Sequence, residues 1–163
     1  MKTLILIRHA KSCWDNPSLE DFLRPLNKRG KKDAPLMAQK LKDKQIIPDL
    51  IISSPSIRTE QTLGYFLEKF NSNKKVIFDE NIYEAPYENL LQIIRQIDNL
   101  HKTIFLIGHN PGLNNLVNSL IDNFINNIPT TGIVRIDFDT GSWKEINRSN
   151  SKLIFFEYPK MFL

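Results

Sequence analysis

The amino-acid sequence predicts an α/β fold, a three-layer αβα sandwich with a mostly parallel mixed sheet, formed by residues 1–163 as a single domain. Short apolar runs alternate with segments whose apolar residues recur at helical spacing, which is typical of strands and helices alternating around a parallel sheet. Towards the C-terminus, closely spaced apolar runs without helical spacing predict antiparallel strands at one edge of that sheet. The chain is long enough for one substantial core, and no repeat or linker divides it.

The elements of this fold are predicted in alternating order along the chain. Apolar and partly β-branched runs predict buried strands at residues 4–7, 50–52, 76–78 and 103–107. Apolar residues at helical spacing predict helices at residues 34–41, 57–70, 87–97 and 113–121. The C-terminal strands are predicted at residues 133–138, 143–147 and 153–157. The first two of these are expected to pair as a hairpin through Thr140, Gly141 and Ser142.

Charged residues are scattered along the chain, with 22 Lys and Arg against 18 Asp and Glu and a formal net charge of +4. This distribution predicts solvated faces rather than a nucleic-acid-binding surface, and a basic rim that attracts anionic substrates is compatible with it. The single cysteine, Cys13, forms no intrachain disulfide and fits a reducing compartment, so we expect a cytoplasmic protein. No apolar run reaches the length of a membrane span or a signal-peptide core, so no membrane association is expected.

Conspicuous polar residues follow three of the predicted parallel strands. The first strand runs into Arg8 and His9, the second precedes a segment with Arg58, and the fourth runs into His109. Because ligands bind beyond the carboxyl ends of such strands, we expect two histidines and two arginines to converge at one edge of the sheet. In a regular strand Arg8 and His9 would face opposite sides, so we expect the strand to break after Ile7.

This combination of residue types suits phosphoryl transfer. A neutral imidazole is a good nucleophile near pH 7, and arginine offers fixed, bidentate donors to phosphoryl oxygens. The reaction requires mainly positioning and positive charge around those oxygens, to which a second histidine can also donate. Pro111 is expected to be the first helical residue after an Asn110 cap, where free N–H groups would lie near a bound phosphate.

These motifs resemble those of the histidine phosphatase superfamily, the phosphoglycerate-mutase-like proteins. The similarity is greatest to the SixA-type phosphohistidine phosphatases, which share Arg-His-Ala-Lys-Ser at residues 8–12. The other similar segments are residues 21–30, 53–62, 108–112 and 129–132. The resemblance covers nearly the whole chain. The chain has no room for the large helical insertion of bigger relatives, which indicates an open site suited to a protein-borne substrate.

The resemblance implies a role for each candidate residue. His9 would be the nucleophile that forms a phosphohistidine, and Arg8, Arg58 and His109 would bind and neutralise the phosphoryl oxygens. Glu84 lies where many relatives carry a proton-donating acid; the alternative is a first-turn carboxylate that the helix dipole favours. No metal and no cofactor are expected, because the arginines supply the positive charge.

The resemblance leaves three hypotheses for the function. The first is a phosphatase that dephosphorylates phosphohistidine in a partner protein, such as a histidine domain of a phosphorelay. The second is a phosphatase for small phosphomonoesters such as sugar phosphates, which Glu84 favours because an alkoxide leaving group needs an acid. The third is a catalytically inactive module that binds phosphoproteins. Mutase activity fits less well, because it needs a closed pocket that retains the intermediate.

Two other phosphatase motifs are incomplete. Asp137, Asp139 and Thr140 resemble the Asp-x-Asp-x-Thr motif of magnesium-dependent phosphatases of the haloacid dehalogenase type. Only 23 residues follow Thr140, too few for the later motifs of that class, so we interpret this segment as a hairpin turn. The Cys-x5-Arg spacing of thiol phosphatases is absent, because Leu19 stands at the sixth position after Cys13.

Overall fold

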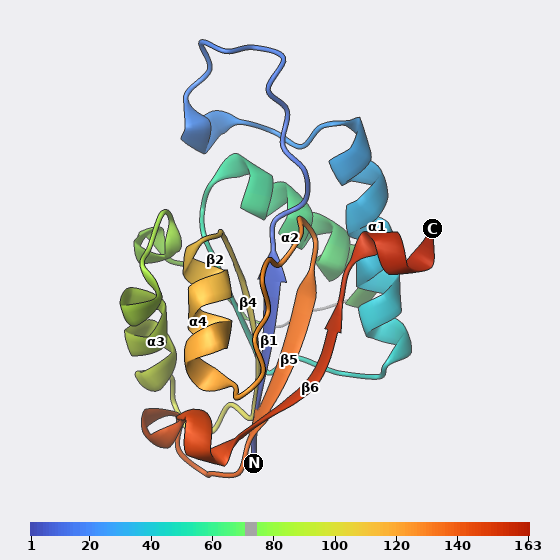
Figure 1. The fold of residues 1–163 in the computed structure, drawn as a ribbon. Coiled ribbons are helices and arrows are strands. Elements are labelled where there is room, and N and C mark those ends of the chain that lie inside the picture. The colour runs from blue at the N-terminus through green and yellow to red at the C-terminus, as the bar shows by residue number, and fades with distance from the viewer. Residues whose placement is uncertain (71–74) are drawn as a thin grey trace.

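A mixed sheet forms the middle layer of the computed structural model, which describes residues 1–70 and 75–163 (Figure 1). The strands in these residues lie in the order β3-β2-β4-β1-β5-β6. Strands β1 (Lys2–Arg8), β2 (Leu50–Ser53), β3 (Val76–Phe78) and β4 (Thr103–Gly108) are parallel, and β5 (Ile133–Phe138) and β6 (Ser151–Glu157) add antiparallel pairs at one edge. The predicted sandwich with a mostly parallel mixed sheet is confirmed.

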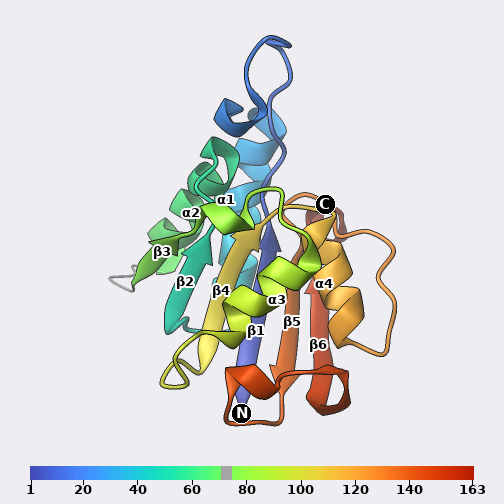
Figure 2. The same cartoon turned by 90° about the vertical axis from the view of Figure 1, so that its left-hand side faces the viewer.

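Helices cover both faces of this sheet (Figure 2). Helices α1 (Lys28–Asp43) and α2 (Ile57–Phe70) pack on one face, and α3 (Tyr87–Arg95) and α4 (Gly112–Leu120) pack on the other. Strand β1 contributes Leu4 and Leu6 to the core beneath α3 and α4, and Ile5 and Ile7 to the core beneath α1 and α2. Because both of its faces are covered, its apolar run is continuous. Within residues 1–70 and 75–163, no helix is long and apolar enough to cross a membrane.

The predicted strand at residues 143–147 is wrong. Trp143–Glu145 is a short 3₁₀ helix, and β5 pairs with β6 instead. The indole of Trp143 is fully buried and donates a hydrogen bond to the carbonyl oxygen of His101 (2.8 Å), and its backbone N–H donates to the side-chain oxygen of Asn99 (2.9 Å). These contacts hold the segment against the chain before β4, so it cannot extend beside β5.

Two element boundaries near the strand ends lie one residue later than predicted. Strand β1 continues through Arg8, whose backbone N–H donates to the carbonyl oxygen of Gly132 (3.0 Å), so the break comes after Arg8 rather than Ile7. Helix α4 begins at Gly112, with Pro111 at the N-cap position. The side chain of Asn110 still caps this helix, because its oxygen accepts a hydrogen bond from the backbone N–H of Asn114 (3.2 Å).

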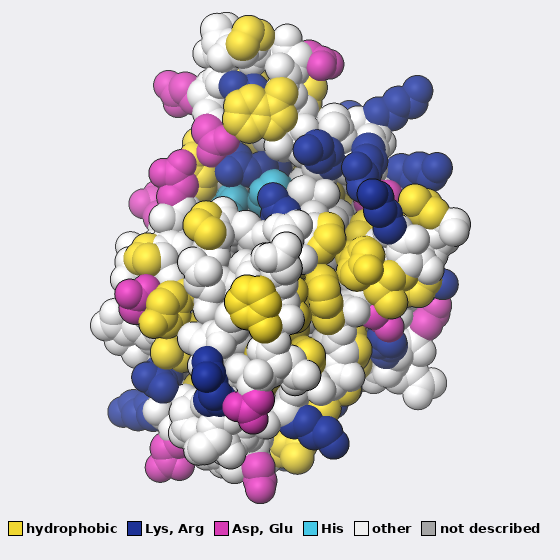
Figure 3. Space-filling view, viewed as in Figure 1, with side chains coloured by type: hydrophobic (Ala, Val, Ile, Leu, Met, Phe, Trp, Pro, Cys, Tyr) yellow, Lys and Arg dark blue, Asp and Glu magenta, His cyan; other side chains and the backbone are white. Residues whose placement is uncertain are grey.

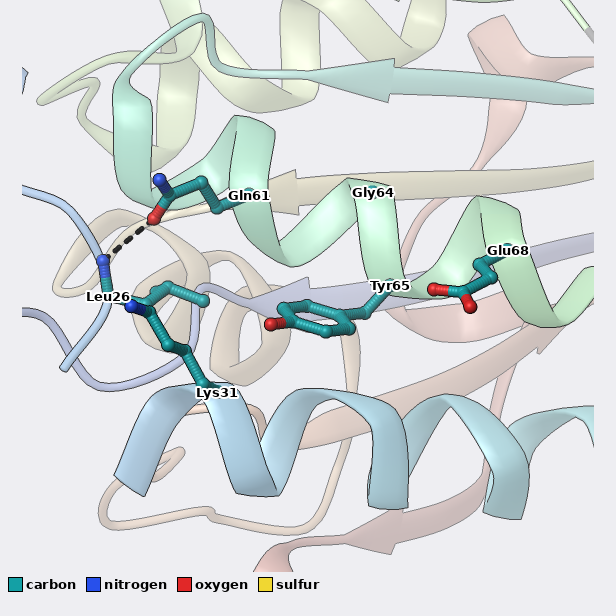
Figure 4. Close-up of a pocket in the computed structure, with 6 residues that line it drawn as sticks. All are labelled: Leu26, Lys31, Gln61, Gly64, Tyr65 and Glu68. Atoms are coloured by element: carbon teal, nitrogen blue, oxygen red, sulfur yellow. Dashed lines mark hydrogen bonds between the residues drawn. The ribbon is translucent and has the colours of Figure 1, made fainter. Parts of the chain in front are cut away.

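A long loop between β1 and α1 projects beyond the carboxyl edge of the sheet (Figure 1). The side-chain oxygen of Gln61 in α2 accepts a hydrogen bond from the backbone N–H of Leu26 (2.8 Å), at the end of a small pocket between α1 and α2 (Figure 4). Arg24 is buried, donates to the carbonyl oxygen of Asn16 (3.1 Å) and stacks on the ring of Trp14. These contacts position the loop above the sheet edge.

Candidate active site

Two histidines lie side by side at the carboxyl edge of the parallel strands. His9 follows β1 and His109 follows the neighbouring strand β4, and their ring centroids are 5.3 Å apart. Only 8% of His9 and 6% of His109 is exposed. Arg58, in the first turn of α2, approaches this pair, with its Nη2 at 3.3 Å from Nδ1 of His109. The structure therefore brings together polar residues that follow three different strands.

The hydrogen bond of His9 defines its tautomer. Nδ1 lies 2.7 Å from the carbonyl oxygen of Ala10, which can only accept, so Nδ1 carries the proton and Nε2 carries the lone pair. The pKa of His9 is lowered to about 4, mainly by burial and further by the charges of Arg58 and Arg8, against the effect of this hydrogen bond. At neutral pH the ring is therefore uncharged, with Nε2 available as a nucleophile.

His109 has a different set of partners. Its Nδ1 faces the guanidinium of Arg58, which can only donate, so Nδ1 accepts and Nε2 donates to the hydroxyl of Ser54 (2.9 Å). Burial, followed by the proximity of His9 and Arg58, lowers the pKa of His109 to about 3. A neutral ring results, and an arriving dianion would raise this pKa and favour the doubly protonated, donating form.

Arg58 is held by Asp21 from the loop above the sheet. Its Nη1 donates to the backbone carbonyl of Asp21 (2.8 Å), and its Nη2 donates to the carboxylate (3.0 Å). The hydroxyl of Tyr83 donates to the same carboxylate oxygen (2.5 Å). Burial acts to raise the pKa of Asp21, but the hydrogen bond from Tyr83 and the charge of Arg58 outweigh it and lower that pKa. The sequence analysis assigned no role to Asp21 or Tyr83. Asp21 lies in a segment that is similar to SixA-type proteins, and this similarity could have indicated its role.

Arg8 is fixed at the end of β1 by the turn that precedes β5. Its Nη1 donates to the carbonyl oxygen of Ile128 (2.8 Å), and burial together with the charge of Arg58 lowers its pKa. The backbone N–H of Thr131 donates to the carbonyl oxygens of both Arg8 and His9 (3.1 Å each). Thr131 has a φ of +60°, which is strained for a β-branched residue, and this turn holds the Arg8–His9 backbone in place.

Glu84 borders the same region as the histidines. A cavity of about 560 Å³ is lined by Asp21, Arg58, His109, Glu84 and four neighbours, which are Ala85, Pro86, Asn110 and Pro111. Glu84 is exposed and has a φ of +53°. A Cβ on Gly112 would lie 2.2 Å from the carbonyl oxygen of Ala85, so the glycine permits the close approach that brings the Glu84 segment to the start of α4.

Residues 4–103 match the family model of the histidine phosphatase superfamily, branch 1. This chain belongs to that superfamily. SixA from Agrobacterium tumefaciens, proposed to be a phosphohistidine phosphatase, is 28% identical and has a TM-score of 0.85, with 97% of this chain and 98% of that chain covered.

Two sequence relatives of this histidine phosphatase are longer proteins. An uncharacterised chloroplastic protein of Arabidopsis thaliana is 37% identical over 120 residues, 68% of this chain and 55% of that protein. Phosphoserine phosphatase 1 of Hydrogenobacter thermophilus is 42% identical over 90 residues, 53% of this chain and 40% of that enzyme. The aligned parts therefore span only about half of these relatives or less.

The fold is the predicted phosphoglycerate-mutase-like fold, and membership of the superfamily supports a hydrolase that acts on phosphoryl groups. The similar proteins differ in substrate, since one is named for phosphohistidine and another for phosphoserine. The superfamily therefore defines the class of reaction and leaves the substrate to be proposed.

Asp137 lies far from the histidines of this phosphatase. Its carboxylate accepts two hydrogen bonds from Arg135 (2.9 and 3.0 Å) and one from Thr3 (2.9 Å), near the amino end of β1. Asp137 therefore forms an ion pair with Arg135 of the same strand, at the opposite end of β1 from His9. In the part of the chain that the structure describes, no group of three or more His, Cys, Asp or Glu side chains could hold a metal ion.

Proposed function

We propose that this protein dephosphorylates phosphohistidine in a partner protein, such as a histidine domain of a phosphorelay, by transferring the phosphoryl group to His9. One observation carries the proposal: His9 is buried and neutral, and its Nδ1 proton is directed to the carbonyl oxygen of Ala10, so Nε2 is free to attack. The similarity to SixA of Agrobacterium tumefaciens over nearly the whole chain supports the substrate class.

The reaction proceeds in two displacements at phosphorus. First, Nε2 of His9 bonds to phosphorus while the bond from phosphorus to the substrate's imidazole nitrogen breaks, and that nitrogen keeps the electron pair. The substrate ring, protonated on its other nitrogen, leaves as neutral imidazole. Second, a water oxygen bonds to phosphorus and the bond to Nε2 breaks. Dihydrogen phosphate leaves with both protons of the water, and the neutral His9 ring is restored.

Arg8, Arg58 and His109 are proposed to bind the phosphoryl oxygens during both steps. The transition state spreads charge over these oxygens, so catalysis requires fixed positive groups around them. Asp21 holds Arg58 through two hydrogen bonds, so the guanidinium is oriented before substrate binds. This pre-organisation lowers the cost of ordering the side chain in the transition state.

A second candidate function is hydrolysis of small phosphomonoesters. Glu84 lines the cavity beside Arg58 and His109, and an alkoxide leaving group needs a proton from such an acid. The similarity to phosphoserine phosphatase 1 of Hydrogenobacter thermophilus supports the same alternative. With a phosphohistidine substrate the leaving imidazole requires less assistance, so Glu84→Gln should reduce ester turnover more than peptide turnover.

The deciding measurement compares turnover of a phosphohistidine peptide and p-nitrophenyl phosphate in the presence of a chelator. His9→Ala should lower kcat/KM on the peptide by at least ~10³-fold, because the covalent route is lost. His101→Ala is the matched control and should retain wild-type turnover. His101 accepts its hydrogen bonds from Lys2 and Trp143 through its backbone carbonyl, which the substitution keeps.

The outcomes separate the three hypotheses. Rapid peptide cleavage that depends on His9, with slow ester hydrolysis, supports the phosphohistidine phosphatase. Faster ester hydrolysis identifies a small-molecule phosphatase instead. Binding of the peptide without turnover of either substrate would mean an inactive phosphoprotein-binding module.

A further inference from the structure

Arg8 lines a second depression, distinct from the cavity that Glu84 borders. It has a volume of about 340 Å³, and four cationic side chains contribute to its lining: Arg8, Lys11, Arg29 and Lys160. Tyr158 and Asn127 add polar groups to the same depression. We call this the basic depression. Its cations come from the end of β1, the loop that follows β1, the first turn of α1 and the C-terminal 3₁₀ helix Pro159–Phe162.

Backbone packing brings these separate segments together. A Cβ on Gly30 would lie 2.3 Å from the carbonyl oxygen of Lys11, so only glycine allows α1 to approach the Lys11 backbone this closely. That carbonyl accepts a hydrogen bond from the backbone N–H of Asn27 (2.9 Å), the N-cap residue of α1. The C-terminal 3₁₀ helix packs on α1, where the Lys40 ammonium lies over the ring of Phe162. The cations are therefore gathered by the fold and not by one flexible segment.

The basic depression lacks an internal counter-charge. No Asp or Glu is among its lining residues in the described part of the chain. Arg29 donates through Nε to Asp33 (3.2 Å), which compensates part of its charge, whereas Lys11 and Lys160 are exposed. The acids Asp21 and Glu84 border the other cavity instead. Figure 3 shows the same division, with Asp and Glu side chains to the left of the histidines and Lys and Arg side chains to the right.

Arg8 connects the basic depression to the proposed catalytic histidine. It lines the depression and directly precedes His9, and the charge of Arg8 contributes to the lowered pKa of His9. Its Nε is buried and has no hydrogen-bond partner among the described residues. An anion in the depression and a phosphoryl group on His9 would therefore both lie close to Arg8.

We propose that the basic depression is a second anion subsite, which binds a carboxylate or phosphate that the substrate carries in addition to the transferred phosphoryl group. This inference rests on the proposed phosphatase function of His9. Two positive subsites that share Arg8 would select substrates with a second negative group near the phosphoryl group. Such complementary charge favours the correct partner and speeds its association.

The test compares matched substrates that differ only in the second anion. One pair is a phosphohistidine peptide with Glu residues flanking the phosphohistidine and the same peptide with Gln in their place. The other pair is 3-phosphoglycerate and glycerol 3-phosphate, which differ by a carboxylate. The enzyme variants are the double variant Lys11→Ala/Lys160→Ala and, as control, Lys152→Ala, an exposed lysine at the start of β6.

We expect the wild type to prefer the doubly anionic member of at least one pair in kcat/KM. In the double variant this preference should fall ~10-fold, because two exposed positive charges are removed. Turnover of p-nitrophenyl phosphate, which has a single anionic group, should stay within ~2-fold of wild type. The preference should also weaken as salt is raised, as expected for exposed charges.

Each outcome bears on the subsite separately from the proposed function. A preference for the Glu peptide that the double variant loses supports an acidic protein substrate. The same loss confined to 3-phosphoglycerate supports the subsite but contradicts the phosphohistidine substrate. Equal turnover within both pairs in the wild type, or an equal loss in Lys152→Ala, would overturn the subsite even if phosphohistidine is cleaved.

Discussion

The two histidines of the site are kept neutral by their surroundings. His9 and His109 are buried next to each other, and Arg58 and Arg8 add positive charge nearby. Protonation of either ring would place another positive charge in this cluster, away from bulk water. In the proposed reaction this arrangement would supply a nucleophile and a binding site for a dianion, at a cost in stability when the pH falls.

This cost gives a prediction for the pH dependence of stability. In the unfolded chain His9 takes up a proton near the ordinary histidine pKa of 6.5, whereas in the folded protein it does so only near about 4. Between these values the unfolded state binds more protons, so the free energy of unfolding falls as the pH falls, by on the order of 3 kcal/mol for His9. Urea unfolding at pH 7.5 and 4.5 should therefore show a smaller loss for His9→Ala than for the wild type.

Carboxylates also titrate in this range, so the comparison between variants is essential. His101→Ala, which removes a histidine outside the cluster, should lose stability on acidification as the wild type does. If His9→Ala and the wild type lost the same free energy, the ring of His9 would not be held neutral by the fold.

Helix α1 is positioned by close backbone contact at its first turn. Gly30 lies so near the carbonyl oxygen of Lys11 that a Cβ would approach it to 2.3 Å, whereas a Cβ on Gly64 in α2 would meet nothing within 4 Å. Both glycines lie in helices, so helix propensity alone would favour alanine at both positions. At Gly30, tertiary packing therefore decides whether substitution by alanine raises or lowers the free energy of unfolding.

This pair of glycines gives a matched test of the packing. Gly30→Ala should lower the free energy of unfolding by about 1–3 kcal/mol, because the added methyl group forces backbone to move. Gly64→Ala should raise it by about 0.5–1 kcal/mol, because alanine reduces the entropy of the unfolded chain. Urea denaturation followed by circular dichroism measures both. Stabilisation by Gly30→Ala would show that α1 does not press on Lys11.

The sheet connects the two cores of the molecule. Neighbouring residues of β1 and β4 alternate between the core under α1 and α2 and the core under α3 and α4. Loss of either core would expose one face of these central strands. The shared sheet supports the prediction that residues 1–163 form a single domain. The cytoplasmic location of the protein stays a prediction.

The predicted single domain should unfold in one cooperative transition. In a Trp14→Phe variant, the fluorescence of buried Trp143 reports on the core under α3 and α4, and far-ultraviolet circular dichroism reports on all helices. The two probes should give the same urea midpoint. Separate midpoints would mean that the two faces of the sheet unfold independently.

The sequence by itself determined the layers and the place of the site. The central strands are covered on both faces, so their runs are continuously apolar and could be found without tertiary information. Parallel strands place their carboxyl ends at one edge, so Arg8, His9 and His109 could be assigned to that edge from position alone. The motifs around them also resembled those of the histidine phosphatase superfamily, to which the family model then assigned the chain.

Only the tertiary structure decided the finer arrangement. The tautomer of His9 and the orientation of Arg58 depend on individual hydrogen bonds, and the Tyr83–Asp21 contact joins residues 62 positions apart. The strand predicted around Trp143 was wrong because its indole finds a buried partner in the carbonyl of His101. Local propensity describes what a segment favours in isolation, whereas these features depend on atoms that only folding brings within hydrogen-bond distance.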